Sequence, residues 1–158
     1  MIENISVFDV AAYILRECGP MHASKLHGLC YYSKAWGLVW DKKPIFNEAF
    51  AAYRFGPTCP ELQRVRQVPF SVIRSQRSLK ITRLPRGRAK RIKGWRRSTI
   101  DSVLKAYGEL TGEQLKDLSV SEAPWKDARK HAREWPAPCN IMISDESMSS
   151  FYAAIPKS

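Results

Sequence analysis

Apolar residues near the start of the chain recur at steps of three and four, which places them on one face of a helix. The clearest case is the stretch 26–40, LHGLCYYSKAWGLVW, which holds two tyrosines and two tryptophans. Aromatic residues at helical spacing more often form a wall of the core than a binding face. We therefore predict a helix from residue 22 or 23 to Trp40, with Lys25, Tyr31 and Lys34 facing outward.

Other helix starts are predicted from capping patterns, in which a Ser or Thr is followed three residues later by an acidic residue or Gln. The patterns begin at Ser6, Thr58, Ser98 and Thr111. Ser121 is expected to cap a helix that begins near Pro124, and a final helix is expected to start near Ser144 or Asp145. Gly19-Pro20 ends the first helix, because glycine tolerates the left-handed cap and proline cannot continue the helix.

The remaining elements are short. Residues 50–55 are predicted to form a strand or an extended segment, and the β-branched pieces 71–74 and 79–82 predict a small hairpin. Residues 85–94, PRGRAKRIKG, are expected to form a mobile basic loop. The sum is a mainly α chain, a compact helical bundle that forms a single domain over residues 1–158.

Charge changes this picture in one region. The chain of 158 residues carries a formal net charge of +11, yet the segment from Leu62 to Ile100 contains 13 Lys and Arg and no Asp or Glu. The other 13 of the 26 basic residues are outnumbered by the 15 acidic ones, so the basic excess belongs to a basic insert at about residues 74–97. Its candidate binding residues are Arg86, Arg88, Lys90, Arg91, Lys93 and Arg96.

Three interpretations of this insert stay open. Its cations can contact phosphates, with Trp95 stacking on a base. They can instead face the acidic surface of a protein partner, or they can form a solvated loop with no partner. The insert has no recognisable recognition helix, which counts against specific reading of DNA.

The residue patterns favour neither catalysis nor metal binding. The chain contains no nucleophile elbow, zinc-protease, P-loop or dinucleotide motif. A zinc site can be drawn from Cys18, His22, His27 and Cys30, but Gly19-Pro20 interrupts it and the close pairs of a closed zinc site are missing. We therefore expect no enzyme, no metal and no cofactor.

The cysteines and the apolar runs indicate the compartment. The four cysteines are widely spaced, which predicts free and mostly buried thiols in a cytoplasmic protein: Cys18, Cys30, Cys59 and Cys139. The sequence contains no run of about twenty apolar residues, so we predict no membrane span. The N-terminal residues lack the pattern of a signal peptide.

Three separated stretches resemble one known family. The first resembles the family's KLQKLLYYAQGW helix and its KPLFDE segment, and consists of Met21–Leu26, Leu29–Tyr32, Trp36 and Lys43–Phe46. The second, AYRFGP at residues 52–57, is similar to the AWxYGPV segment, and the third, SVSEAPWKDAR at residues 119–129, to the THxExPWxxAR box. Together they cover about residues 5–152 and resemble the Panacea domain of SocA-like antitoxins.

This resemblance implies an antitoxin that neutralises a cognate toxin by direct protein contact, without enzymatic activity and without a cofactor. Some relatives are linked instead to delivering the toxin to a protease. A nucleic-acid-binding accessory protein of a phage or plasmid is the alternative from another functional class. The candidate partner-binding residues in the motif-bearing segments are Lys25, Tyr31, Lys34, Arg54, Phe55, Glu122, Trp125 and Arg129.

Two of these residues also have a structural interpretation. Glu122 can satisfy the first-turn amides of a helix, and Trp125 can fill the core. The chain also departs from the family pattern at His27-Gly28, Lys34 and Gly37. A glycine inside a helix costs about 1 kcal/mol relative to alanine, so Gly28 and Gly37 indicate either close approach of another backbone or sequence drift.

Overall fold

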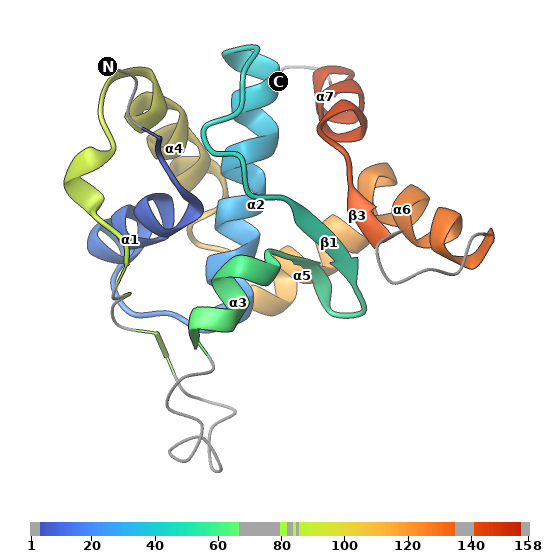
Figure 1. The fold of residues 1–158 in the computed structure, drawn as a ribbon, viewed down its shortest axis with the longest axis horizontal. Helices are drawn as coiled ribbons and strands as arrows, with labels where there is room; N and C mark the ends of the chain where they lie inside the picture. Colours follow the sequence, from blue (N-terminus) through green and yellow to red (C-terminus); the bar gives the residue numbers. More distant parts are fainter. Residues whose placement is uncertain (1–3, 67–79, 82–83, 85, 135–140, 156–158) are drawn as a thin grey trace.

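The computed structural model describes residues 4–66, 80–81, 84, 86–134 and 141–155. The fold is mainly α with a small antiparallel sheet, so the predicted fold class is confirmed (Figure 1). The elements, in chain order, are α1 Val7–Cys18, α2 Ala23–Trp40, β1 Phe50–Tyr53, β2 Gly56–Thr58, α3 Pro60–Arg66, the 3-10 turn η2 Ala89–Arg91, α4 Gly94–Tyr107, α5 Gly112–Val120, α6 Ala123–Glu134, β3 Met142–Ile143 and α7 Asp145–Ala153.

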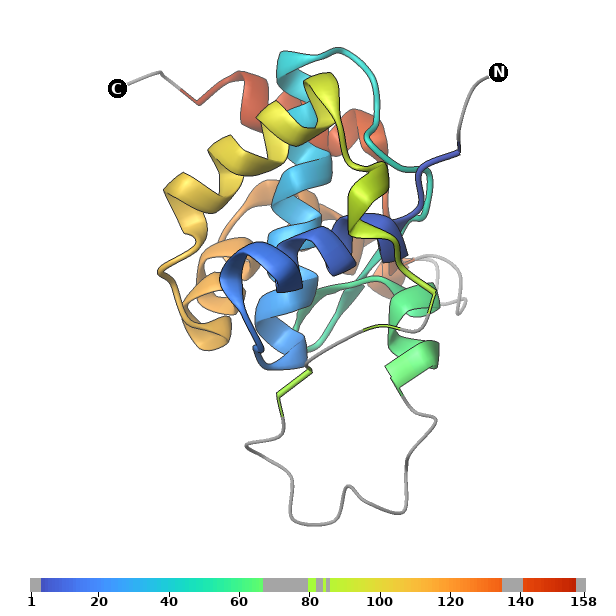
Figure 2. The same ribbon diagram turned by 90° about the vertical axis from the view of Figure 1, so that its left-hand side faces the viewer.

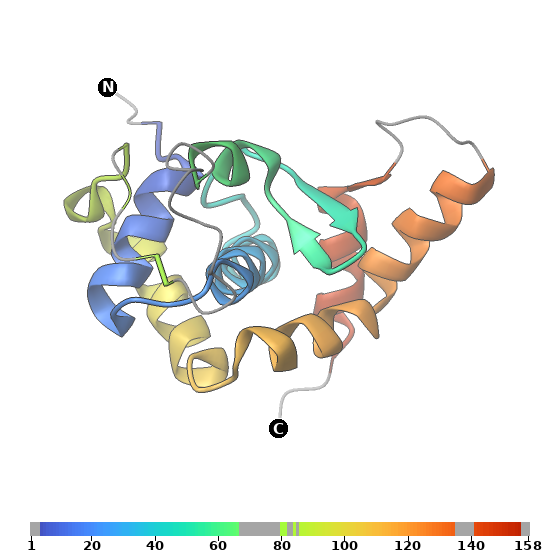
Figure 3. The same cartoon turned by 90° about the horizontal axis from the view of Figure 1, so that it is seen from below.

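Helix α2 is the centre of the fold. Figure 3 shows it nearly end-on, with α1, α4, α5 and α7 arranged around it. Because neighbours cover it on several sides, 11 of its 18 residues are buried. The predicted helix is confirmed, but the outward orientation of Tyr31 and Lys34 is wrong: their exposed fractions are 0% and 1%. Lys25 is half-buried.

Three predicted caps begin helices as expected. The Ser6 and Thr111 side chains accept hydrogen bonds from the amides of the third helical residues, at 3.4 and 3.0 Å, and both are complete capping boxes. The Ser144 hydroxyl accepts from the amide of Ser147 at 3.0 Å and starts α7. Gly19 ends α1 with φ of 84°, a backbone conformation that favours glycine.

Three other capping predictions are wrong in detail. Helix α4 begins at Gly94, four residues before Ser98, because contacts beyond the local sequence extend it: Trp95 packs on the core and the Arg96 side chain donates to the Ile45 carbonyl at 3.2 Å. The Ser121 hydroxyl does not cap α6 but donates to the Leu118 carbonyl of α5 at 2.6 Å.

The third wrong capping prediction concerns helix α3, which starts later than the Thr58 pattern predicts. Its first residue is Pro60, so Cys59 rather than Thr58 precedes it, and the Thr58 hydroxyl donates instead to the Gly56 carbonyl at 3.1 Å. A proline suits this first helical position because its missing amide would be unpaired there in any case.

The sheet is small and antiparallel, with strand order β2-β1-β3. Strand β1 confirms the predicted extended segment over residues 50–53, whereas residues 54–55 form a turn. It pairs with β2 in a hairpin whose register aligns Ala51 with Thr58. Ile143 of β3 lies opposite Phe50. The hairpin predicted at 71–74 and 79–82 falls largely outside the described residues. Its residue Ile81 forms a bridge with Met21.

The two glycines inside α2 both lie against close neighbours. A Cβ added at Gly28 would lie 3.2 Å from the Leu115 side chain of α5, and one added at Gly37 would lie 3.0 Å from the Ile45 side chain. The nearest neighbours are side chains, and the Lys43 carbonyl oxygen would lie 3.7 Å from a Cβ at Gly37, so close approach rather than drift explains both glycines. These glycines therefore let α5 and the loop after α2 pack tightly on the central helix.

The cysteine prediction holds in part. Cys18, Cys30 and Cys59 are free thiols, and Cys30 and Cys59 are buried. Cys18 is exposed, because it ends α1 at the surface, so its expected burial is wrong. Cys139 lies outside the described residues. Within the described ranges, no helix is long and apolar enough to cross a membrane.

Candidate partner-binding surface

A group of polar side chains, here called the tyrosine–glutamate centre, lies beside α2 and consists of Tyr31, Tyr32, Glu122 and Tyr152. One oxygen of the Glu122 carboxylate accepts hydrogen bonds from the hydroxyls of Tyr32 at 2.6 Å and Tyr152 at 2.7 Å. The hydroxyls of Tyr152 and Tyr31 lie 3.1 Å apart. The centre therefore joins α2 and α7 to the junction between α5 and α6.

Burial sets the protonation behaviour of this centre. It raises the pKa of Glu122 above its ordinary value, and the two tyrosine hydroxyls only partly offset that rise. Burial also raises the pKa of Tyr31, Tyr32 and Tyr152, so these phenols stay neutral near pH 7. The Glu122 side chain thus accepts from phenols rather than from first-turn amides, which corrects the structural interpretation drawn from the sequence.

Helix α6 holds the β1–β2 hairpin in place. The Trp125 indole donates to the Tyr53 carbonyl at 2.9 Å, and the Arg129 guanidinium donates to the Ala52 carbonyl at 3.0 Å. The Arg129 guanidinium also lies 5.5 Å from the centre of the Trp125 ring. Two of the three family-like segments therefore meet here, and half-buried Trp125 and Arg129 act as the contacts between them.

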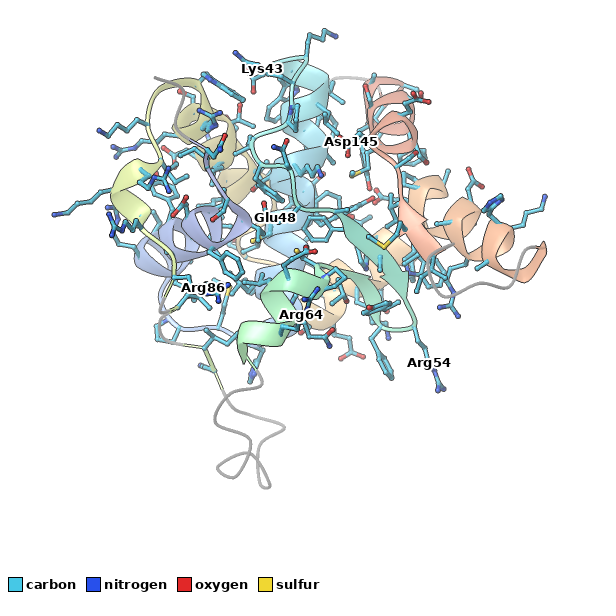
Figure 4. The ribbon with its side chains drawn as sticks, in the orientation of Figure 1. Lys43, Glu48, Arg54, Arg64, Arg86 and Asp145 are labelled. Carbon is cyan, nitrogen blue, oxygen red and sulfur yellow. The ribbon has the colours of Figure 1, made fainter. Side chains whose placement is uncertain are left out.

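The hairpin tip, defined as Arg54 and Phe55, lies beyond these contacts. Both residues are exposed, and Phe55, with 71% of its surface accessible, is the most exposed large hydrophobic side chain in the described part of the chain. Gly56 closes the turn with φ of 112°, a conformation that favours glycine. Arg54 points away from the body of the protein (Figure 4).

Two of the predicted partner-binding lysines are engaged inside the fold. The Lys34 ammonium donates to the Glu48 carbonyl at 2.8 Å and pairs with Asp145 at 3.3 Å, which ties α2 to the start of α7. The Lys25 ammonium donates to the Gly108 carbonyl at the end of α4, at 2.6 Å. Both lysines therefore stabilise helix ends or loops around α2.

The described residues 86–97 of the basic insert have defined structure. Residues 86–93, here called the basic strap, run along α1 and include the turn η2, as Figure 2 shows, so the expectation of a mobile loop is wrong. The reason is Asp9, which is 1% exposed: it accepts from the Arg88 amide at 2.9 Å and pairs with the Arg91 guanidinium at 3.2 Å. The last residues of the insert, 94–97, belong to α4.

The other candidate residues of the insert are either exposed or packed against the fold. Arg86, Arg88, Lys90 and Lys93 are exposed. Arg96 is half-buried, and its guanidinium lies 4.6 Å from the centre of the Trp95 ring, which the Lys43 ammonium also approaches to 4.5 Å. The Trp95 ring is therefore already in contact with two cations, which leaves less of it for the base stacking considered from the sequence.

Metal binding and nucleophilic catalysis need specific groupings of side chains such as His, Cys, Asp and Glu. Among the described residues, no three His, Cys, Asp or Glu side chains gather in a way that could hold a metal ion. The backbone amide of Cys59 donates to Nδ1 of His27 at 3.1 Å. Burial raises the pKa of the Cys59 thiol to about 12 and that of Cys30 well above its ordinary value, the opposite of an activated thiolate.

Sequence reasoning missed two residues that organise these surfaces. Asp9 was interpreted only as a helix cap, and its hold on the basic strap bridges 79 positions to Arg88. Tyr152 belongs to the final helix that the sequence predicts from Ser144 or Asp145, and no pattern marks its hydroxyl as a hydrogen-bonding group. The available signals were weak: an acidic residue within the apolar start of α1, and one tyrosine near the end of the chain.

These features define a small helical domain that keeps its tyrosine–glutamate centre internal and presents an aromatic residue on a fixed hairpin tip. The model of one family, described as antitoxin SocA-like, Panacea domain, matches residues 26–126. The chain belongs to this family, as the resemblance of its motifs predicted. Comparisons with curated proteins and with solved structures gave no match.

Proposed function

We propose that this protein is an antitoxin that neutralises a cognate toxin by direct binding, acting without catalysis and without a cofactor. Its membership of the antitoxin family supports a role in a toxin–antitoxin pair. The observation that carries the mechanism is the hairpin tip: Phe55 is 71% exposed on a turn that Trp125 and Arg129 hold in place.

An exposed aromatic side chain on a fixed support is well suited to protein recognition. Fully burying a phenylalanine against a partner contributes about 1.5–3 kcal/mol, and the fixed turn reduces the entropy lost on binding. Arg54 adds a cation beside the ring, with its guanidinium 5.5 Å from the ring centre. Aromatic residues and arginine are also the types enriched among residues that dominate binding energy.

The test is co-expression with the neighbouring gene, scoring growth and co-purification. We expect the wild-type protein to restore growth and to form a stable complex with the gene product. Phe55→Ala should weaken the complex by about tenfold or more, equivalent to about 1.4 kcal/mol. The matched control is Met142→Ala, which removes another exposed apolar side chain, 39% accessible, on β3; it should bind as wild type does.

Each other outcome has a definite meaning. Equal binding by Phe55→Ala and wild type would show that the toxin contacts another surface. Growth rescue with falling toxin levels and no stable complex would support delivery to a protease instead of masking. Absence of both toxicity and complex formation would contradict the proposed function.

A further inference from the structure

A hollow of about 530 Å³ lies between α1 and the basic strap. Its lining consists of Arg16, Arg88, Ala89, Lys90, Arg91 and Lys93. Five of these six residues are cationic, and none of the described residues that line the hollow is acidic. Its volume falls in the range of pockets that hold one small ligand or a few side chains.

The walls of this hollow are fixed rather than loose. Asp9 holds the strap at the Arg88 amide and the Arg91 side chain, and Ile92, 2% exposed, anchors its end in the core. The strap backbone lies so close to α1 that a Cβ added at Gly87 would clash with the Phe8 carbonyl oxygen. A ligand would therefore meet cations whose backbone positions are already set.

The charges of the hollow are only partly balanced within the fold. Arg91 is paired with Asp9 at 3.2 Å, and Arg16 with Glu17 at 3.2 Å. Among the described residues, no ion pair includes Arg88, Lys90 or Lys93. Three unpaired cations around one hollow repel one another, and a bound anion would relieve that repulsion.

The geometry favours carboxylates of a protein over nucleic acid. Channels for single-stranded nucleic acid follow the backbone over about four nucleotides or more and add aromatic rings on which the bases stack. Among the described residues, none that lines this hollow is aromatic, and Trp95, two positions after Lys93, already contacts Lys43 and Arg96. Lysine and arginine side chains around a short concave site instead match a few Asp or Glu side chains.

We propose that the hollow binds an acidic segment of the toxin, whose carboxylates pair with Arg88, Lys90 and Lys93. This proposal rests on the proposed function only in naming the toxin as the source of the segment. It adds an electrostatic docking site to the apolar contact made by the hairpin tip.

The test uses the purified full chain and a fluorescent peptide of alternating Glu and Gly, with an alternating Gln and Gly peptide and a short oligothymidine as comparisons. We expect the Glu peptide to bind, and its affinity to fall with added salt, because the contact is made by exposed charges. The Gln peptide should not bind. The triple variant R88S/K90S/K93S should weaken binding of the Glu peptide by about tenfold or more.

A matched control separates the site from the overall charge. Lys105, Lys126 and Lys130 are exposed on α4 and α6, so K105S/K126S/K130S removes the same charge away from the hollow. It should weaken binding by no more than about twofold. Equal weakening by both triple variants, or no binding of the Glu peptide by the wild type, would overturn the proposal.

Two further outcomes are informative. Tighter binding of oligothymidine than of the Glu peptide at equal salt would assign the hollow to nucleic acid and overturn the proposal. Because these measurements use no toxin, their failure leaves the proposed antitoxin function standing. Conversely, the chain could bind the Glu peptide yet form no complex with the product of the neighbouring gene. That result would contradict the proposed antitoxin function and support the anion-binding site in the hollow.

Discussion

Glu122 and Phe55 both belong to family-like segments, but the fold uses them in opposite ways. Glu122 is 8% exposed and accepts two phenolic hydrogen bonds within the tyrosine–glutamate centre. Phe55 is 71% exposed on the hairpin tip. Trp125 and Arg129 connect the two regions, because α6 follows directly after Glu122 and fixes the hairpin.

This difference distinguishes residues that hold the fold together from a residue that the fold leaves exposed at its surface. Most side chains that make the motifs recognisable are used inside the fold, where they position α2, α6 and the hairpin. The hairpin tip itself makes few contacts that the fold needs. A family-like segment can therefore hold both residues that build the scaffold and an exposed residue that the fold does not bury, which is the residue type we propose for partner contact.

The largest effect is expected from breaking the tyrosine–glutamate centre. Glu122→Leu leaves the Tyr32 hydroxyl without its acceptor and leaves Tyr152 with the Tyr31 hydroxyl alone, so we expect a loss of roughly 1–3 kcal/mol from Tyr32 and a smaller loss from Tyr152 in the free energy of unfolding. Urea unfolding measures this loss. Glu122→Gln is the control, since its amide oxygen can still accept both hydroxyls and should lose much less. Equal losses would show that packing, not hydrogen bonding, sets the role of Glu122.

A smaller effect should follow from loosening the connection between the two regions. Arg129→Ala removes the hydrogen bond to the Ala52 carbonyl and should lower the free energy of unfolding by about 1 kcal/mol. It should also weaken toxin binding without altering Phe55, because the hairpin tip loses a support. Calorimetric titration with the toxin checks this, with Lys130→Ala on the same helix as control. Unchanged toxin affinity would show that the tip needs no such support.

The smallest effect is a dependence of stability on pH. The pKa of Glu122 is raised above its ordinary value of 4.5 in the folded protein, so between 4.5 and the raised pKa the native state binds more protons than the unfolded state. The contribution of Glu122 is therefore full below pH 4.5 and decreases as the pH rises through the raised pKa. Urea unfolding across this window should show the decrease in wild type and not in Glu122→Gln. Identical profiles would contradict it.

Local chemistry predicted much of the fold. Ser6, Thr111 and Ser144 cap helices as expected because a capping hydroxyl and the amide it accepts from lie within three residues of each other. The Ser98 and Ser121 predictions were wrong because distant or neighbouring groups decide those positions. The Ile45 carbonyl, 51 positions from Arg96, is one of the contacts that extend α4 beyond its local cap.

The candidate site was harder to predict for a related reason. Helical periodicity assumes one buried face, whereas α2 is covered on several sides, so Lys34 is buried and paired with the Glu48 carbonyl and Asp145. The density of positive charge located the basic insert correctly, but it also led us to predict a mobile loop at residues 85–94, where the described residues 86–93 pack on α1. The basic strap is held by Asp9, a single acidic residue far away in sequence, which no pattern within the insert can reveal.

Asp9 also has a consequence for how the protein folds. Its carboxylate accepts hydrogen bonds from the Ser6 amide at the start of α1 and from the Arg88 amide in the strap. One side chain therefore stabilises two segments that are far apart in sequence. Neither piece can open without exposing the carboxylate that the other uses. The first turn of α1 and the basic strap are therefore coupled through one carboxylate, and the strap can reach it only when the chain between them closes a long loop.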